Sequence, residues 1–142
     1  MQFQPYLIFD GNCAEAMQSY ERLLGGKLEK MMTVRDMPDD ACGAMPPGSA
    51  DRIIHACLEF GGGMLMASDS MPGQPYEGMK NFSVTLTYPT PADAKPVFDA
   101  LAKGGNVFMP FAKTFWAEAF GMVTDRFGTP WMINGGLCLQ EA

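Results

Sequence analysis

His55 is the only histidine among the 142 residues, and it is the side chain best suited to acid–base chemistry. Imidazole titrates near neutral pH, so it can take up and return a proton under physiological conditions. Glu59 and Glu118 are carboxylates that could assist it, although both are equally typical of solvated surface residues. A histidine bonded to a neighbouring hydroxyl or carboxylate would instead be structural. Asp125 precedes Arg126 in a turn-like sequence, where aspartate favours the turn rather than chemistry.

The thiols of four cysteines are the other reactive groups, namely Cys13, Cys42, Cys57 and Cys138. None of them belongs to a C-x-x-C pair, which argues against a structural zinc site. The first residues lack the basic flank and apolar run of a signal peptide, so we expect a cytoplasmic protein with free thiols. Cys13 falls at the start of a predicted helix, where the helix dipole can lower the pKa of a thiol. The alternative is an inert small residue in the first helical turn.

The composition restricts the partners of the chain. Hydrophobic residues make up 47% of it, which is enough for a core, and the net charge is −6. An acidic protein repels both nucleic acid and anionic membrane surfaces, so neither is an expected partner. No segment approaches the roughly 20 apolar residues of a membrane span. The remaining partners are small molecules that are neutral or cationic.

The first half of the chain predicts a strand, a helix and three further strands. Residues 4–9 form the first strand, and the helix follows from Asn12, which forms a capping-box pattern with Glu15. Gly25-Gly26 ends this helix, because glycine adopts the left-handed conformation at low cost. The other predicted strands cover residues 27–34, 52–60 and 63–69, with a loop over residues 35–51 and a tight turn at residues 61–63.

The second half repeats this order. A strand over residues 82–88 leads to a helix that is capped at Thr90-Pro91 and ended by Gly104-Gly105. Pro96 lies inside this helix and suggests a later start. The remaining strands are predicted over residues 106–111, 117–124 and 129–134. The repeat predicts one domain with an α+β fold, in which two tandem βαβββ modules (about 2–70 and 80–136) form curved mixed sheets around a cleft.

Several segments resemble the vicinal-oxygen-chelate superfamily, which includes glyoxalases, bleomycin-resistance proteins and extradiol dioxygenases. The opening matches are residues 10–16 (DGNCAEA) and 20–26 (YERLLGG). Residues 66–69 (MASD), 114–116 (TFW) and 120–134 (FGMVTDRFGTPWMIN) resemble its PhnB-like branch. That branch is often labelled a 3-demethylubiquinone methyltransferase. The label has no support here, because no glycine-rich loop between a strand and a helix could hold S-adenosylmethionine.

The resemblance also indicates where a metal would be bound. Metal-dependent members take ligands from the first and last strands of each module, and they are usually His, Glu or Gln. The equivalent positions here are Pro5, Met66, Ser83 and Met132. Proline has no ligating side chain, and thioethers and a lone hydroxyl suit a divalent cation poorly. We therefore expect no metal and no other cofactor.

Strand alternation predicts which side chains lie opposite the helices, on the open face of each sheet. The continuous apolar side of each strand should face the helix, which leaves His55, Cys57 and Glu59 on the open face. Trp116 belongs to an aromatic segment that is either a lid over the site or part of a dimer interface. The candidate ligand-binding residues are Phe9 (with its neighbour Leu7), Met66, Ser68, Ser83, Thr85, Trp116, Met132 and Asn134.

Three functions remain open. The first is metal-free binding of a small molecule in the cleft between the modules, as in superfamily members that sequester a drug. The second is an enzyme that acts on a small oxygenated substrate, with His55 as acid and base. A metalloenzyme with differently placed ligands is a third possibility. The superfamily also implies a homodimer, and unpaired sheet edges that need covering favour the same assembly.

Overall fold

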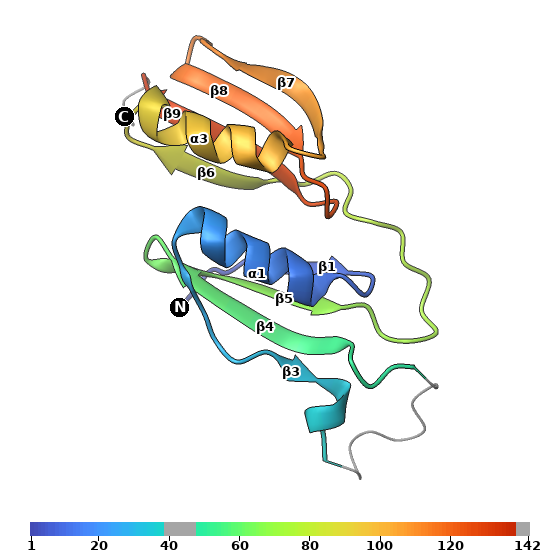
Figure 1. The fold of residues 1–142 in the computed structure, drawn as a ribbon. Coiled ribbons are helices and arrows are strands. Elements are labelled where there is room, and N and C mark those ends of the chain that lie inside the picture. Colours follow the sequence, from blue (N-terminus) through green and yellow to red (C-terminus); the bar gives the residue numbers. More distant parts are fainter. Residues whose placement is uncertain (39–47, 139–142) are drawn as a thin grey trace. The chain divides into compact units, whose positions relative to one another are not determined.

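The computed structural model describes residues 1–38 and 48–138, which form two compact units (Figure 1). Unit 1 is Met1–Gly78 and unit 2 is Met79–Ala142. Cys42 and most of the predicted loop over residues 35–51 lie outside the described residues. Within the described ranges, no helix is long and apolar enough to cross a membrane.

Unit 1 contains a mixed sheet with one helix. β1 runs parallel to β5, β5 is antiparallel to β4, and both β2 and β3 pair with β4. The strand that was predicted over residues 27–34 is in fact two short strands followed by a 3₁₀ turn. The elements are β1 (Tyr6–Phe9), α1 (Cys13–Leu24), β2 (Lys27–Leu28), β3 (Met32–Thr33), η1 (Val34–Asp36), β4 (Ile53–Phe60) and β5 (Gly63–Asp69).

Unit 2 repeats this topology. Its sheet has the order β6-β9-β8-β7, with β6 parallel to β9 and the other pairs antiparallel. The elements are β6 (Val84–Tyr88), α3 (Pro91–Ala102), β7 (Asn106–Ala112), β8 (Ala117–Thr124) and β9 (Pro130–Leu137). The predicted α+β fold of two modules is confirmed.

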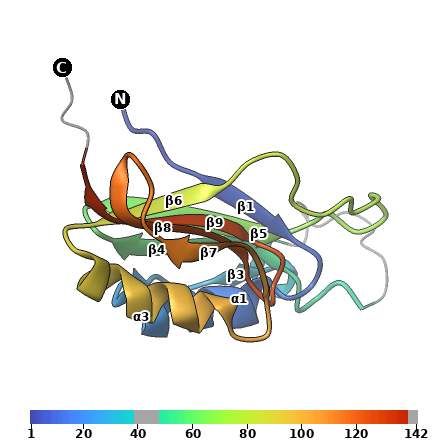
Figure 2. The same cartoon turned by 90° about the horizontal axis from the view of Figure 1, so that it is seen from above.

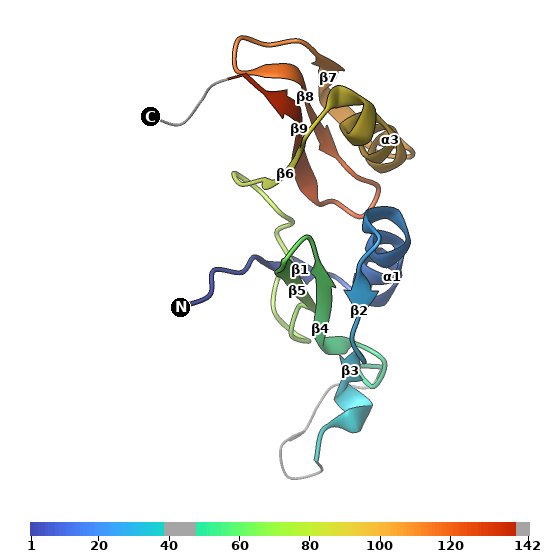
Figure 3. The same ribbon diagram turned by 90° about the vertical axis from the view of Figure 1, so that its left-hand side faces the viewer.

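Each helix covers one face of its own sheet (Figures 2 and 3). α1 packs on β4 and β5, and α3 packs on β8 and β9. The side chains beneath the helices are almost entirely buried, and each large one contributes about 1.5–3 kcal/mol to folding. They include Met17, Tyr20, Leu58, Leu65 and Ala67 in unit 1, and Phe98, Leu101, Val123, Trp131 and Ile133 in unit 2. Over residues 1–38 and 48–138, the opposite face of each sheet carries no helix of its own unit.

The two Gly-Gly pairs have the same structural cause in both units. Gly25 and Gly104 adopt left-handed backbone angles, with φ of 73° and 74°. At Gly26, an added Cβ would lie 2.6 Å from the carbonyl oxygen of Glu59. At Gly105, it would overlap the carbonyl oxygen of Thr124. Gly25 therefore ends α1 as its C-cap, whereas Gly104 turns the chain directly after Lys103, the C-cap of α3. The second glycine of each pair lets the returning chain approach β4 in unit 1 and β8 in unit 2.

The two helices begin differently. Thr90 caps α3 as predicted, since its hydroxyl accepts a hydrogen bond from the Asp93 amide at 3.1 Å. The predicted later start of α3 is wrong, because the helix begins at Pro91 and passes through Pro96. Pro96 is exposed, so water can reach the carbonyl that lacks its partner N–H.

The predicted capping box of α1 is also wrong, because Asn12 makes no side-chain capping bond. Asp69 takes that role from the end of β5. Its Oδ1 accepts hydrogen bonds from the amides of Gly11 and Cys13, at 2.8 and 3.1 Å. Its Oδ2 accepts one from the Ile53 amide at 2.8 Å. A single buried carboxylate thus holds the start of α1 against the start of β4.

Candidate functional site

A row of thioether side chains crosses the open face of unit 2. Met132 on β9 pairs with Thr85 on β6 and with Met122 on β8. Met122 in turn pairs with Met109 on β7. Paired residues of neighbouring strands place their side chains on the same face, so one hydroxyl and three thioethers follow one another across the sheet.

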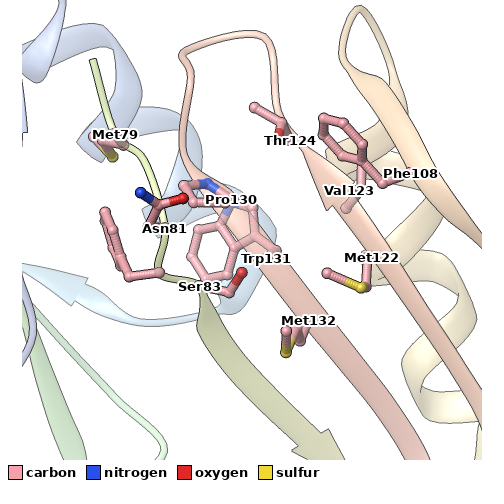
Figure 4. A pocket seen from close by; sticks show the side chains of 11 residues that line it. Met79, Asn81, Ser83, Phe108, Met122, Val123, Thr124, Pro130, Trp131 and Met132 are labelled. Carbon is pink, nitrogen blue, oxygen red and sulfur yellow. The ribbon is translucent and has the colours of Figure 1, made fainter. Parts of the chain in front are cut away.

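A pocket of about 510 Å³ lies at the end of this face that adjoins the β8–β9 turn (Figure 4). This volume falls within the range of ordinary small-molecule sites. None of the side chains that line it is charged, and sulfur-containing and aromatic groups predominate. They are Met79, Asn81, Phe82, Ser83, Phe108, Met122, Val123, Thr124, Pro130, Trp131 and Met132.

Asp125 holds the β8–β9 turn, which adjoins the pocket, and the buried residue Trp131 that follows it. Its Oδ1 accepts hydrogen bonds from the amides of Phe127 and Thr129, at 2.9 and 3.1 Å. Its Oδ2 accepts one from the indole Nε1 of Trp131, at 2.8 Å. The prediction that Asp125 serves the turn is therefore confirmed. Its carboxylate also fixes the orientation of the Trp131 ring.

Asn81 is the one non-glycine residue with positive φ among the described residues, at 62°. Asparagine tolerates this left-handed conformation better than most side chains, and such angles concentrate at functional sites. The amide lies between Met79 and Ser83 in the close view of the pocket (Figure 4). Strand patterning could not reveal it, since Asn81 precedes β6 in a segment without periodicity.

The structure distributes the predicted binding residues of unit 2 over this face. Ser83 and Met132 line the pocket, and Thr85 is exposed beside Met132. Asn134 lies two residues further along β9, where its Nδ2 donates to the Thr87 hydroxyl at 3.3 Å. Its buried Oδ1 has no hydrogen-bond partner in the described part of the chain. Trp116 lies apart from the pocket lining.

The aromatic residues just before β8 contact one another and a phenylalanine of β8. The ring of Trp116 meets Phe120 edge-on at 5.0 Å between centroids, and Phe115 meets Trp116 in the same way at 4.8 Å. Phe115 itself is 82% exposed. Trp116 therefore packs within its own unit, and Phe115 presents a large apolar ring to solvent.

Unit 1 has a smaller set of functional groups on its open face. Tyr6 pairs with Met66, and Met66 pairs with Cys57. His55 is half-buried, and its Nδ1 lies 3.4 Å from the Tyr6 hydroxyl, with ring centroids 6.0 Å apart. This contact agrees with the predicted alternation that places His55 opposite Ala56. Glu59 is exposed, and the polar group beside the His55 ring is the phenol of Tyr6.

The placement of Phe9 and Leu7 on the open face is wrong. They are 0% and 1% exposed, and Leu7 pairs with Ala67, which lies under the helix. The parallel pairing of β1 with β5 determines which residues of β1 face the helix, and it puts Tyr6 and Ile8 on the open face instead. Ser68 pairs with Ile8 and is 9% exposed. Phe9 is thus a core residue, and Ser68 is the better-placed candidate of the two.

Burial disfavours the thiolate, which is the reactive form, at the two buried cysteines that the structure describes. Burial, followed by the neighbouring charge of Asp69, raises the pKa of Cys13 to about 12. Of the two interpretations of Cys13, the inert residue in the first helical turn is the one supported, because desolvation and the carboxylate both oppose the thiolate. Burial and then the charges of Glu29 and Glu59 also raise the pKa of Cys57. Cys138 is exposed, and all three are free thiols.

The positions that bind metal elsewhere in this fold do not offer a divalent cation suitable ligands. Met66, Ser83 and Met132 supply two thioethers and a hydroxyl, and Pro5 supplies no side-chain donor. Hard and borderline divalent cations require imidazole, carboxylate or thiolate groups in larger number. Over residues 1–38 and 48–138, no group of three or more His, Cys, Asp or Glu side chains is arranged to hold a metal. No step of a reaction is therefore derived through a metal.

With this geometry established, comparison with known proteins decides the family. The model of the Glyoxalase/Bleomycin resistance protein/Dioxygenase superfamily matches residues 2–133. The chain belongs to this superfamily.

The similar proteins include close and distant ones. Protein YjdN of Escherichia coli is 39% identical over 144 residues, covering 94% of this chain and 95% of that protein. The crystal structure of protein PA1353 from Pseudomonas aeruginosa has a TM-score of 0.86 at 49% identity, covering 94% and 96% of the two chains. A PhnB protein from Bacillus cereus, titled a putative 3-demethylubiquinone-9 3-methyltransferase, has a TM-score of 0.77 at 24% identity, covering 94% and 98%. This last likeness shows a shared fold and leaves the activity open.

Sequence reasoning missed most of the pocket lining. Met122 and Phe108 lie on strands that were predicted, and alternation along residues 117–124 would have placed Met122 beside Met132. Met79, Asn81 and Phe82 lie in the connection before β6, where no periodic signal exists. The pocket depends on how this connection folds back over the sheet, which only the structure shows.

Proposed function

We propose that this protein binds a small organic molecule without a metal, in the pocket on the open face of unit 2. The observation that supports the proposal is the uncharged pocket of about 510 Å³ with methionine and phenylalanine walls. Thioethers are flexible and polarizable, so they adapt to the shape of an apolar ligand. A few hydroxyl and amide groups among apolar walls are the usual composition of such sites.

The first test looks for a ligand from the expression host that stays bound to the protein through purification. Protein purified from the expression host is measured by native mass spectrometry, beside the variants Met122→Lys and Met71→Lys. Met122 lines the pocket, whereas Met71 is an exposed residue of unit 1 and serves as the control. We expect an adduct on wild type and Met71→Lys and its loss from Met122→Lys. An adduct that survives in both variants would place the ligand elsewhere.

Metal independence is tested separately. Protein prepared without a metal-affinity tag is analysed by plasma mass spectrometry for Zn, Ni, Fe and Mn. We expect far less than one metal per chain, because Met66, Ser83 and Met132 offer poor ligands. Near-stoichiometric metal together with loss of ligand binding after chelation would contradict the proposal.

One contact favours a second function, an enzyme that acts on a small oxygenated substrate. The Tyr6 hydroxyl and His55 Nδ1 lie 3.4 Å apart, close enough to orient the ring for proton transfer. The ligand recovered from the protein is incubated with wild type and with His55→Gln, and its mass and isomeric form are followed. Conversion by wild type alone would support catalysis. An unchanged ligand with wild type would leave binding as the function.

We also propose that the protein is a homodimer. Large apolar side chains are exposed on β7, at the end of the sheet of unit 2, and in the segment that follows. They are Val107, Phe108, Met109 and Phe115, which are 41%, 66%, 40% and 82% exposed. Burial of these exposed apolar side chains by a second copy is favourable. Light scattering should give twice the chain mass for wild type and a shift toward monomer for Phe115→Glu, and a monomeric wild type at tens of micromolar would refute it.

A further inference from the structure

We infer that the ligand of the unit 2 pocket is an uncharged aromatic molecule whose polar group is recognised by the side-chain amide of Asn81. This inference rests on the proposed function and makes it more specific. It names the class of ligand and one residue that determines specificity.

The charge of the ligand follows from the lining. None of the eleven lining side chains can supply a counter-charge. Lys80 stands between two lining residues in the sequence but does not line the pocket, and the carboxylate of Asp125 is already taken up by the Trp131 indole and two backbone amides. An ionised group that left water for these walls would lose hydration without compensation. A neutral molecule has no such cost.

The aromatic character follows from the partners that the walls provide. Met79, Met122 and Met132 contribute three thioethers, and Phe82 and Phe108 contribute two rings. Sulfur–aromatic contacts are favourable beyond simple burial, and so are offset or edge-on contacts between rings. A flat aromatic ring can make both kinds of contact at once, whereas an aliphatic ligand of equal size gains only from burial.

The polar group of the ligand is assigned from Asn81. Its backbone is held in the left-handed region at φ 62°, and its side chain is among those that line the pocket (Figure 4). Asn81 is exposed, and within the described residues its amide makes no side-chain hydrogen bond, so its donor and its acceptor are accessible to water and to a ligand that displaces it. An amide offers one of each, and a carboxamide or lactam on the ligand would match them as a pair.

A series of four naphthalene probes with the same ring system tests the charge and the polar group. They are 2-naphthamide, 2-methylnaphthalene, 2-naphthoate and 2-naphthylmethylammonium, and their binding is measured by probe fluorescence in competition. We expect the amide to bind best. The methyl compound should be weaker by about three- to tenfold, the worth of one or two hydrogen bonds. Both ions should bind more weakly than the methyl compound.

Two substitutions of Asn81 keep its unusual backbone and change only the side chain. Asn81→Gly retains the left-handed conformation without strain, so the fold should be unchanged while the preference for the amide over the methyl compound disappears. Asn81→Asp also tolerates this conformation and should turn the preference toward the ammonium probe. If Asn81→Gly keeps the amide preference, or if naphthoate equals naphthamide in wild type, the inference is wrong.

The failure of this inference can be distinguished from failure of the proposed function. Methylnaphthalene needs only the apolar walls, and Met122→Lys should abolish its binding. If it binds wild type and is lost in Met122→Lys while the four probes show no preference, the pocket is a binding site but the assigned ligand class is wrong. If no probe binds up to its solubility, both the pocket and the ligand class are refuted.

Discussion

The two units share one topology, but the residue that pairs with the end of the first strand is an aspartate in unit 1 and a glycine in unit 2. Phe9 pairs with Asp69 where β1 meets β5, and Tyr88 pairs with Gly135 where β6 meets β9. Asp69 reaches across to the start of α1 and of β4 with its carboxylate. At Gly135, an added Cβ would lie 2.7 Å from the Cα of Pro91, so the start of α3 sits directly on the strand.

The difference shows two ways to attach a helix to the same sheet. Unit 1 leaves a gap between the strand and the helix start and bridges it with a charged group. Unit 2 closes the gap, removes the side chain, and caps its helix locally with Thr90. Charge-assisted hydrogen bonds from one carboxylate to three amides form a concentrated interaction, whereas close packing distributes the stabilisation over many atoms. The stability of unit 1 should therefore depend more strongly on a single side chain, that of Asp69, than the stability of unit 2 depends on any one side chain at its helix start.

The largest effect is expected from Asp69→Ala. It leaves the amides of Gly11, Cys13 and Ile53 without their acceptor, and the free energy of unfolding of unit 1 should fall by about 3–5 kcal/mol. Asp69→Asn keeps one acceptor oxygen, so its free energy of unfolding should fall by less. Urea unfolding is followed by far-UV circular dichroism, which reports on both units.

A matched control for this substitution is Asp51→Ala. Asp51 pairs with Arg35 at 2.9 Å, but its side chain is 84% exposed, and surface ion pairs contribute little. Both tryptophans, Trp116 and Trp131, lie in unit 2, so indole fluorescence reports on that unit alone. Equal unfolding midpoints for Asp69→Ala and Asp51→Ala would contradict the bridging role of Asp69.

A smaller loss is expected from Gly135→Ala. The new methyl group would collide with the backbone of Pro91, and backbone atoms cannot move aside as a flexible side chain can. Overpacking of this kind costs about 1–3 kcal/mol. Gly63→Ala is the control, because its nearest neighbour would be a carbonyl oxygen at 4.0 Å and its φ is not positive. Indole fluorescence should show the shift for Gly135→Ala, and equal stability of the two variants would exclude the close approach of α3.

The sequence predicted the order of elements because the signals were local. Gly25-Gly26 and Gly104-Gly105 marked the helix ends, Thr90-Pro91 marked a helix start, and alternation marked the long strands. The errors arose where a distant group decided the outcome. Asn12 and Glu15 formed a plausible capping box, but Asp69, 57 residues after Asn12, supplies the cap instead.

The candidate site was predictable only in part, for the same reason. Ser83 and Met132 followed from strand phase, and both line the pocket. Phe9 was misplaced because the phase of the short strand β1 is set by its pairing with β5, which the sequence does not reveal. Asn81 lies outside any periodic segment, and its left-handed conformation is a property of the folded chain.

The smallest effect sharpens the contrast between the two helix starts. Thr90→Ala removes the hydroxyl that accepts a hydrogen bond from the Asp93 amide, and loss of such a cap costs about 1 kcal/mol. Asn12→Ala removes a side chain at the equivalent start of α1 that makes no capping bond, so its cost should be only a few tenths of a kcal/mol. Both substitutions place alanine at the N-cap, which makes the pair internally matched, and urea unfolding of the two variants gives the comparison directly. A loss for Asn12→Ala as large as for Thr90→Ala would mean that Asn12 caps α1 in solution, and the role of Asp69 as the substitute cap would then have to be given up.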